Sequence, residues 1–277
     1  MRYVQESTVY PGWRVYLNPR VLGMLFLGFS AGLPLLLVGG TFTAWLGDLG
    51  IELSAIGFLS WVGMAHSIKV IWAPLVDRLP IPVLSAIFGR RRAWMLTAQV
   101  AIAISLVGMG LTDPREQLWL VAVWAVIAAF GSATQDVAID AYRVEAAPST
   151  HQAAMAATYV TGYRVAILVA GAGALHIASV ANWSLSYALM GAFMIVGMIT
   201  TLISREPASN PDRIAPESEE RVIRYLADTA HDGLKRRLTA WFIGAFVCPF
   251  TDFFQRYGRA AIVILLFVST FRFSDLF

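Results

Sequence analysis

Two aspartates stand four residues apart in the stretch SATQDVAIDAYRVE at 132–145, which closes an apolar run beginning near Leu118. On a helix this spacing places the carboxyl groups of Asp136 and Asp140 on one face, one turn apart, and Ser132 extends that face. A charged side chain at membrane depth costs about 2.5 kcal/mol or more, so it normally faces a bundle interior or a wet cavity. We therefore expect this face to mark a path for ions or substrate.

Two cations, Lys69 and Arg164, fall inside other apolar runs. Counted along the helices, they share the inner half of the membrane with the two aspartates. In one interpretation the four charges only compensate one another: Lys69 pairs with one aspartate or extends toward the inner surface, and Arg164 pairs with the other. In the second, an aspartate exchanges a proton while Lys69 or Arg164 binds an anionic substrate. Arg164 is the better anchor, because a guanidinium forms two parallel hydrogen bonds with a carboxylate.

Other site chemistry has weaker support in the sequence. Gln135 is a candidate for binding hydroxyl or amide groups of a substrate, although polar contacts between helices explain it equally well. His66 and His176 lie near opposite ends of their spans and share no ligand spacing, so we expect no metal site. No Walker loop, HExxH helix or hydrolase elbow occurs in the sequence. We therefore expect that the protein binds no cofactor and is not an enzyme. Two alternatives stay open: a membrane-embedded transferase that uses the aspartate pair, and a non-transporting sensor or structural half.

The composition explains why these charges stand out. Of the 277 residues, 57% are hydrophobic and 14% are charged, whereas a soluble domain carries about 25% charged residues. The mean hydropathy is +0.63, which indicates an integral membrane protein. The single cysteine, Cys248, excludes an intramolecular disulfide and makes a cysteine-based redox or metal site unexpected.

Six apolar runs are long enough to cross a bilayer, which takes about 20 residues. They cover residues 21–45, 54–76, 93–112, 118–140, 153–179 and 183–204, and a seventh starts near Tyr257 and reaches the last residue. The first run holds Gly28 and Gly32 at the GxxxG spacing that lets neighbouring helices approach closely. The sequence thus predicts an all-α, polytopic transmembrane helix bundle.

Basic residues between the spans predict the orientation. Three precede the first span, four lie in the 77–92 loop, one lies in the 141–152 loop and nine lie between 205 and 259. The loops of the other side hold only Arg115. Because cytoplasmic loops are enriched in Lys and Arg, we expect a cytoplasmic N-terminus. The basic residues follow one side of the membrane instead of one compact domain, so nucleic acid is not an expected partner.

The order of the spans predicts three parts. Residues 1–204 form a six-helix half, 205–256 form a polar cytoplasmic linker with an interfacial amphipathic helix, and 257–277 begin a second half. Six spans, a long cytoplasmic link and a seventh span entering from the cytoplasm follow the plan of a transporter built from two six-helix halves. We expect the chain to be a fragment whose missing partner is the C-terminal half.

The loop between the second and third spans is rich in charge. Asp77 and Arg78 open it, and Gly89, Arg90 and Arg91 close it within the run FGRRR at 88–92. One interpretation is a basic anchor at the inner membrane surface. The other is a gating loop, in which these charges latch the helix ends together.

Several motifs in chain order resemble one family. They are GFSAGLPLLL at 28–37, AWL at 44–46, KVIWAPLVDR at 69–78, FGRRRAW at 88–94, SATQDVAIDAYR at 132–143, TDFFQRYG at 251–258 and FRFSDLF at 271–277. The chain is similar throughout to the AmpG-type muropeptide permeases of the major facilitator superfamily. Its loop departs from the superfamily pattern GxxxDRxGRR, because Ala73 replaces the first glycine and residues 79–88 separate Arg78 from Gly89. The related acetyl-CoA transporters share the outline.

The resemblance implies a function. It implies import of anhydromuropeptides, which are small anionic glycopeptides, across a bacterial inner membrane by proton symport, for cell-wall recycling and β-lactamase induction. In this superfamily spans 1, 4, 7 and 10 line the cavity, which would place Asp136 and Asp140 beside it. Arg272 and Asp275 match the family's seventh-span pattern.

Overall fold

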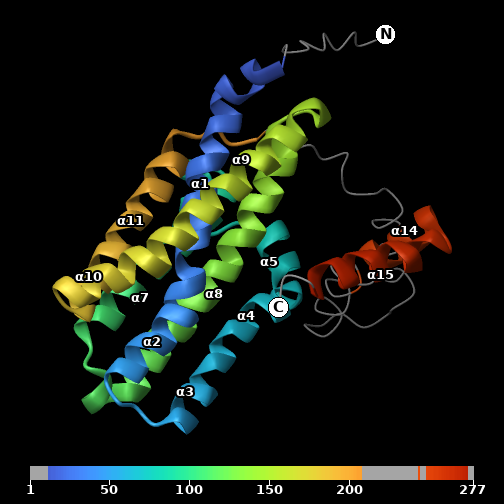
Figure 1. Cartoon of the computed structure of the whole chain (residues 1–277). Coiled ribbons are helices and arrows are strands. Elements are labelled where there is room, and N and C mark those ends of the chain that lie inside the picture. The colour runs from blue at the N-terminus through green and yellow to red at the C-terminus, as the bar shows by residue number, and fades with distance from the viewer. Residues whose placement is uncertain (1–11, 208–242, 244–247, 274–277) are drawn as a thin grey trace, which may run out of the picture. The chain divides into compact units, whose positions relative to one another are not determined.

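The computed structural model describes residues 12–207, 243 and 248–273, and it divides the chain into two compact units, Met1–Ala208 and Ser209–Phe277. The described residues form helices and turns, with no strand among them. Helical segments of the first unit that are long and apolar enough to span a membrane are Pro19–Asp48, Leu53–Ile71, Arg90–Leu111, Pro114–Ala146, Ser149–Val180 and Trp183–Ile203. They coincide with the six predicted spans, so the predicted all-α transmembrane bundle is confirmed (Figure 1).

Side-chain caps fix where several helices begin. Asparagine and aspartate accept hydrogen bonds from the otherwise unpaired N–H groups of a first turn, and proline at the first position loses no bond there. Such caps precede three helices: Asn18 before α1 (Pro19–Leu37), Asp113 before α8 (Pro114–Ala146) and Asn182 before α11 (Trp183–Ile203). The short 3-10 helix η1 (Gly12–Leu17) leads into α1.

The backbones of α1 and α9 (Ser149–Leu168) approach closely. A Cβ atom added at Gly28 would overlap the carbonyl group of Tyr159, and one added at Gly162 would overlap that of Leu25. The close approach predicted from the GxxxG spacing is therefore present. In lipid, no hydrophobic force drives two helices together. Contacts such as this one therefore depend on the van der Waals packing that small residues permit.

The first and fifth spans are both interrupted near the same level. A break at Val38–Gly39 separates α1 from α2 (Gly40–Asp48), and a π-helical turn, η4 (Val169–Gly173), separates α9 from α10 (Ala174–Val180). Hydroxyl groups satisfy nearby carbonyls: Thr41 Oγ1 donates to Ala170 O at 2.8 Å, and the Tyr187 hydroxyl donates to Leu37 O at 2.9 Å. Irregular backbone is tolerated at membrane depth when protein groups satisfy it in this way.

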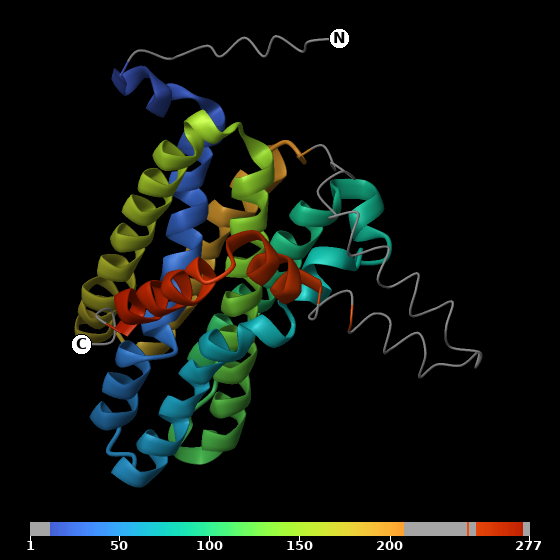
Figure 2. The same ribbon diagram turned by 90° about the vertical axis from the view of Figure 1, so that its right-hand side faces the viewer.

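The second span is not the continuous helix expected for residues 54–76. It consists of α3 (Leu53–Leu59), η2 (Ser60–Met64), α4 (Ala65–Ile68), η3 (Lys69–Ile71) and α5 (Ala73–Arg78). Pro74 at the start of α5 has no N–H to continue a helical ladder, and Gly63 weakens the helix before it. The segments α4 and α5 run along α8, as both views show (Figures 1 and 2).

The remaining helices complete the bundle. After α6 (Leu84–Phe88), α7 (Arg90–Leu111) packs against both α8 and α11. Polar side chains bond one another inside the bundle, as Thr201 Oγ1 donates to Gln99 Oε1 at 3.1 Å. Large apolar side chains such as Phe130, Leu168 and Ile203 are exposed instead, an arrangement that suits a lipid surrounding.

In the second unit, α14 (Cys248–Tyr257) is followed by α15 (Ala260–Phe273). Gly258 has φ +52° between them, a conformation that favours glycine. Most of the predicted 205–256 linker, including its amphipathic part, lies outside the described residues. The three-part division of the chain therefore stays a prediction.

Candidate functional site

A row of polar contacts joins the irregular second span to α8. The Nε2 atom of His66 and Oγ of Ser132 are 3.2 Å apart, and Lys69 Nζ lies 3.3 Å from Asp136 Oδ2. Near them Trp72 Nε1 donates to Thr134 Oγ1 at 3.1 Å. The face of α8 that carries Ser132 and Asp136 therefore meets residues spaced by three along the second span.

The pair formed by Lys69 and Asp136 is largely removed from solvent. The lysine side chain is 28% exposed and the aspartate side chain is 14% exposed. The second carboxylate oxygen of Asp136, Oδ1, is buried and accepts no hydrogen bond within 3.5 Å from the described residues. Tyr159 of α9 also faces this carboxyl group. Asp136 thus holds one cation and lies beside the Tyr159 side chain.

Asp140 lies on the next turn in a different environment. Its side chain is 57% exposed and lies 3.4 Å from Arg143 Nη2 of the same helix. The prediction that charge compensation would pair Arg164 with the second aspartate is wrong, because Arg143 takes that place. Arg143 reaches Asp140 along one helix face at i,i+3 spacing, whereas Arg164 stands on α9, where its side chain is exposed.

The other predicted substrate-binding residues are placed as follows. No ion pair within the described part of the chain involves Arg164. Gln135 is fully buried, and its Nε2 donates to Ser30 Oγ of α1 at 2.7 Å. Within the bundle Gln135 joins two helices, as the packing interpretation predicted. Substrate binding by Lys69, Arg164 and Gln135 stays a prediction.

Arg91 ties three helices together at the end of the bundle where the second and third spans are joined. Its Nη1 donates to Asp77 Oδ1 of α5 at 2.7 Å, and its Nη2 and Nε donate to the two carboxylate oxygens of Glu145 of α8 at 2.6 and 3.1 Å. The Arg91 side chain is 7% exposed. We call this contact of α5, α7 and α8 the latch, and a gating role for it stays a prediction.

A second clasp joins α7 to α11. The carboxylate of Glu206 accepts from the backbone N–H groups of Arg91 at 2.8 Å and of Arg92 at 3.1 Å. It thereby caps the first turn of α7, where unpaired N–H groups and the helix dipole favour an anion. In return the Arg92 guanidinium donates to the carbonyls of Thr201 and Leu202 at the end of α11, at 2.9 and 2.6 Å.

Gly89 allows this clasp to form. Its φ of +90° and ψ of 161° are a backbone conformation that residues with a side chain rarely adopt. A Cβ atom added at Gly89 would also overlap the side chain of Glu206. Arg90 follows it at the start of α7 without an ion pair in the described residues. Of Arg78 and Arg272 the structure describes only the backbone, and Asp275 lies outside the described residues.

Sequence reasoning missed several members of these contacts, among them His66, Trp72, Glu145 and Glu206. The i,i+3 spacing of His66, Lys69 and Trp72 was a signal for one polar face, and Glu145 closes the stretch that carries the aspartates. Glu206 gave no such signal, because it caps α7 from a distant part of the chain. Among the described residues, no three His, Cys, Asp or Glu side chains gather as metal ligands.

Comparisons with known proteins agree with this architecture. The chain is 36% identical over 265 residues to the anhydromuropeptide permease of Escherichia coli K12. The aligned region covers 95% of this chain and 48% of the relative. It is 30% identical over 264 residues to AmpG 4 of Rickettsia conorii, a transporter by its name, covering 95% of this chain and 58% of the relative. The chain therefore spans about half the length of the curated relatives it matches. Residues 24–277 match the Major Facilitator Superfamily, and this multi-pass membrane protein belongs to that family.

Proposed function

We propose that the chain supplies the first half of a permease that imports anhydromuropeptides across a bacterial inner membrane by proton symport. The likeness to the Escherichia coli permease over 95% of this chain supports the substrate class. The observation that carries the mechanism is the partly buried ion pair between Lys69 and Asp136. Ionisable side chains at membrane depth are costly and rare, and those that occur commonly mark the path of an ion or substrate.

The orientation is part of the proposal. The excess of Lys and Arg before the first span, in the 77–92 loop and beyond residue 204 supports a cytoplasmic N-terminus. The latch of Asp77, Arg91 and Glu145 and the clasp of Glu206 would then lie on the cytoplasmic side, where Asp77, Arg78, Gly89, Arg90 and Arg91 would act as the gating loop.

A proton would compete with Lys69 for Asp136, and a substrate carboxylate would compete with Asp136 for Lys69. When Asp136 is charged it holds Lys69, so the ammonium is not free to bind an anion. When a proton neutralises Asp136, Lys69 loses its counter-ion and can bind a carboxylate of the glycopeptide. Asp140, which is exposed one turn away, would pass the proton onward, and Arg164 would bind a second anionic group. Substrate binding and protonation would therefore favour each other.

A second six-helix half would complete the cavity, because transporters of this plan bind substrate between their halves. The chain covers 48% of the Escherichia coli permease, so the remainder of that relative offers a test. The experiment joins residues 1–277 to that remainder and measures uptake of labelled anhydromuropeptide into vesicles, driven by a pH gradient.

We expect uptake in the chimera, and we expect Asp136→Asn and Asp140→Asn to reduce it. Asp136→Asn should still exchange labelled for unlabelled substrate without a gradient, because it mimics the protonated state. Arg115→Gln, on the opposite side of the membrane, is the matched control and should transport normally. If gradient-driven uptake were unchanged in both aspartate variants, the pair would have no part in proton coupling.

A further inference from the structure

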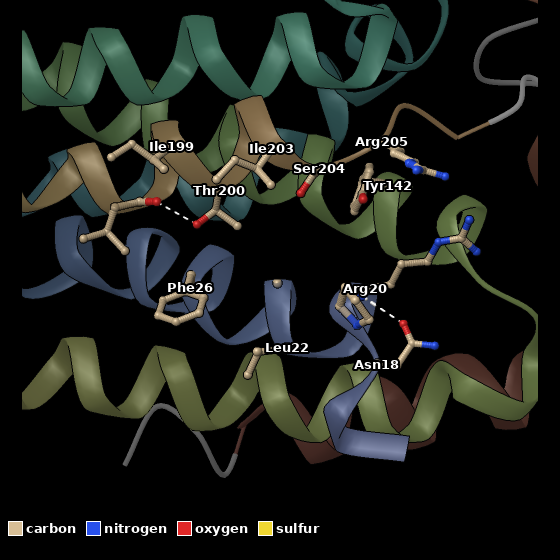
Figure 3. Close-up of a pocket in the computed structure, with 13 residues that line it drawn as sticks. Asn18, Arg20, Leu22, Phe26, Tyr142, Ile199, Thr200, Ile203, Ser204 and Arg205 are labelled. Carbon is tan, nitrogen blue, oxygen red and sulfur yellow. Dashed lines mark hydrogen bonds between the residues drawn. The ribbon is translucent and has the colours of Figure 1, made fainter. Parts of the chain in front are cut away.

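A groove with a cavity volume of about 760 Å³ lies between the first part of α1 and the last part of α11, with Tyr142 of α8 at one end. Figure 3 shows the two helices side by side, with the side chains of Arg20, Tyr142, Ser204 and Arg205 gathered at one end of the groove. None of these residues belongs to the row of contacts between the second span and α8. The groove is therefore separate from the proposed transport site.

The walls of the groove are apolar and open to the surroundings. Leu22 is 45% exposed, Phe26 42%, Ile199 51% and Ile203 77%. Its volume lies within the range of about 300–1,000 Å³ that is typical of small-molecule sites. In a protein that spans a membrane, the compound in contact with such a wall is a lipid acyl chain.

One end of the groove is cationic. The side chains of Arg20 and Arg205 are exposed, and neither has an ion pair within the part of the chain that the structure describes. The hydroxyl groups of Tyr142 and Ser204 line the same end. A guanidinium presents two parallel donors that match a phosphate, so two of them with hydroxyl donors nearby form a site for a phosphodiester.

The position of the two arginines indicates which kind of molecule would carry the phosphodiester. Arg20 is the second residue of α1, and Arg205 follows the last residue of α11 by two positions. Both therefore lie where a span ends, at the level of the lipid headgroups. We propose that this groove binds one anionic phospholipid, with its phosphate between Arg20 and Arg205 and an acyl chain along Phe26 and Ile199.

Gly23 gives a way to fill the groove without breaking the fold. A Cβ atom added there would meet Thr200 Cγ2 at 3.9 Å and Ser204 Oγ at 4.0 Å, which are ordinary contacts. Gly23→Leu therefore extends a side chain into the space where the acyl chain would lie. Gly47→Leu, where an added Cβ meets nothing within 4 Å, is the matched control.

The test is native mass spectrometry of the purified 277-residue chain titrated with palmitoyl-oleoyl phosphatidylglycerol, with the corresponding phosphatidylcholine and glycerol phosphate as further probes. We expect one molecule of phosphatidylglycerol to bind more tightly than either. Arg20→Gln/Arg205→Gln should weaken its binding about tenfold or more, since a charge-assisted hydrogen bond contributes roughly that factor. Gly23→Leu should weaken the binding of both phospholipids.

Arg14→Gln and Gly47→Leu should bind as the unmodified chain does, and thermal unfolding in detergent reports whether each variant is folded. Equal phosphatidylglycerol binding by the folded double arginine variant would overturn the proposal. Equal binding by folded Gly23→Leu, or binding of glycerol phosphate as tight as that of the phospholipid, would overturn it as well, because the apolar groove would then contribute nothing.

Discussion

The Nζ atom of Lys69 lies 3.3 Å from Oδ2 of Asp136, and this contact joins an irregular second span to the long helix α8. The two residues are 67 positions apart in the chain. Lys69 begins a short 3-10 turn, η3, so its side chain leaves the second span where the regular helix is interrupted. The geometry of the pair therefore depends on the break, and the pair in turn holds the broken span against α8.

The first prediction concerns the energetics of this pair. Lys69→Met leaves the buried carboxylate of Asp136 without its cation, and we expect the free energy of unfolding to fall by about 3 kcal/mol. The double variant Lys69→Met/Asp136→Leu removes both charges and should recover most of that loss. Thermal or detergent-induced unfolding of the purified chain, followed by circular dichroism, measures both.

The matched control is Arg143→Gln. It breaks the pair with Asp140, whose side chain is 57% exposed, and exposed pairs on one helix contribute only about 0.5 kcal/mol. A Lys69→Met variant as stable as Arg143→Gln would contradict the structural role assigned to the Lys69–Asp136 pair.

The second prediction concerns Arg91. Arg91→Lys keeps the charge but cannot donate to Asp77 and to both oxygens of Glu145 in the same geometry. Because Arg91 is 7% exposed, we expect a loss of roughly 2–4 kcal/mol. Arg90→Lys, one residue earlier, has no ion pair to lose among the described residues and should unfold like the unmodified chain. Equal stability of the two lysine variants would show that the latch adds nothing.

The third prediction concerns Gly89. Gly89→Ala forces a side chain into a backbone conformation that favours glycine and places its Cβ against Glu206. We expect a loss of about 1–3 kcal/mol and faster proteolysis in the 79–88 loop, because the clasp on α7 weakens. Gly47→Ala, near the end of α2 where an added Cβ meets nothing within 4 Å, should be neutral or stabilising by up to about 1 kcal/mol. Matching melting temperatures for the two variants would argue against the clasp.

The sequence predicted the parts of this fold that follow from local chemistry. The six apolar runs of the required length correspond to the six spans. The glycines at GxxxG spacing in the first run lie at its contact with α9. The broken second span was missed, because its hydropathy alone does not distinguish a continuous helix from short helical turns. The partners of Arg91 and Arg92 were also missed, since Glu145 and Glu206 reach them from 54 and 114 or more residues away.

The site was predictable to a similar extent. The spacing of Asp136 and Asp140 placed both on one face of α8, but it did not reveal that one is 14% and the other 57% exposed. Lys69 of the second span covers Asp136, whereas the cation beside Asp140 is Arg143 of the same helix and leaves that carboxyl group exposed. Spacing along one helix gives a shared face, and only the neighbouring helices decide which residues on that face are buried.

The last prediction concerns the contact of α1 with α9. A Cβ at Gly28 overlaps the Tyr159 carbonyl, and a Cβ at Gly162 overlaps the Leu25 carbonyl, so each alanine variant must push the helices apart. Overpacking costs about 1–3 kcal/mol, and backbone atoms yield less easily than side chains. Once one alanine has moved the helices apart, the Cβ atom of the second alanine no longer overlaps the facing backbone. The double variant should therefore lose clearly less stability than the two single losses together.

Gly57→Ala, whose added Cβ meets nothing within 4 Å, serves as the control in the same unfolding assay and should change stability by less than about 1 kcal/mol. Strictly additive losses in the double variant would mean that the two glycines act at independent contacts. The backbones of α1 and α9 would then not be held together by one shared approach, and the close packing described for this helix pair would be wrong.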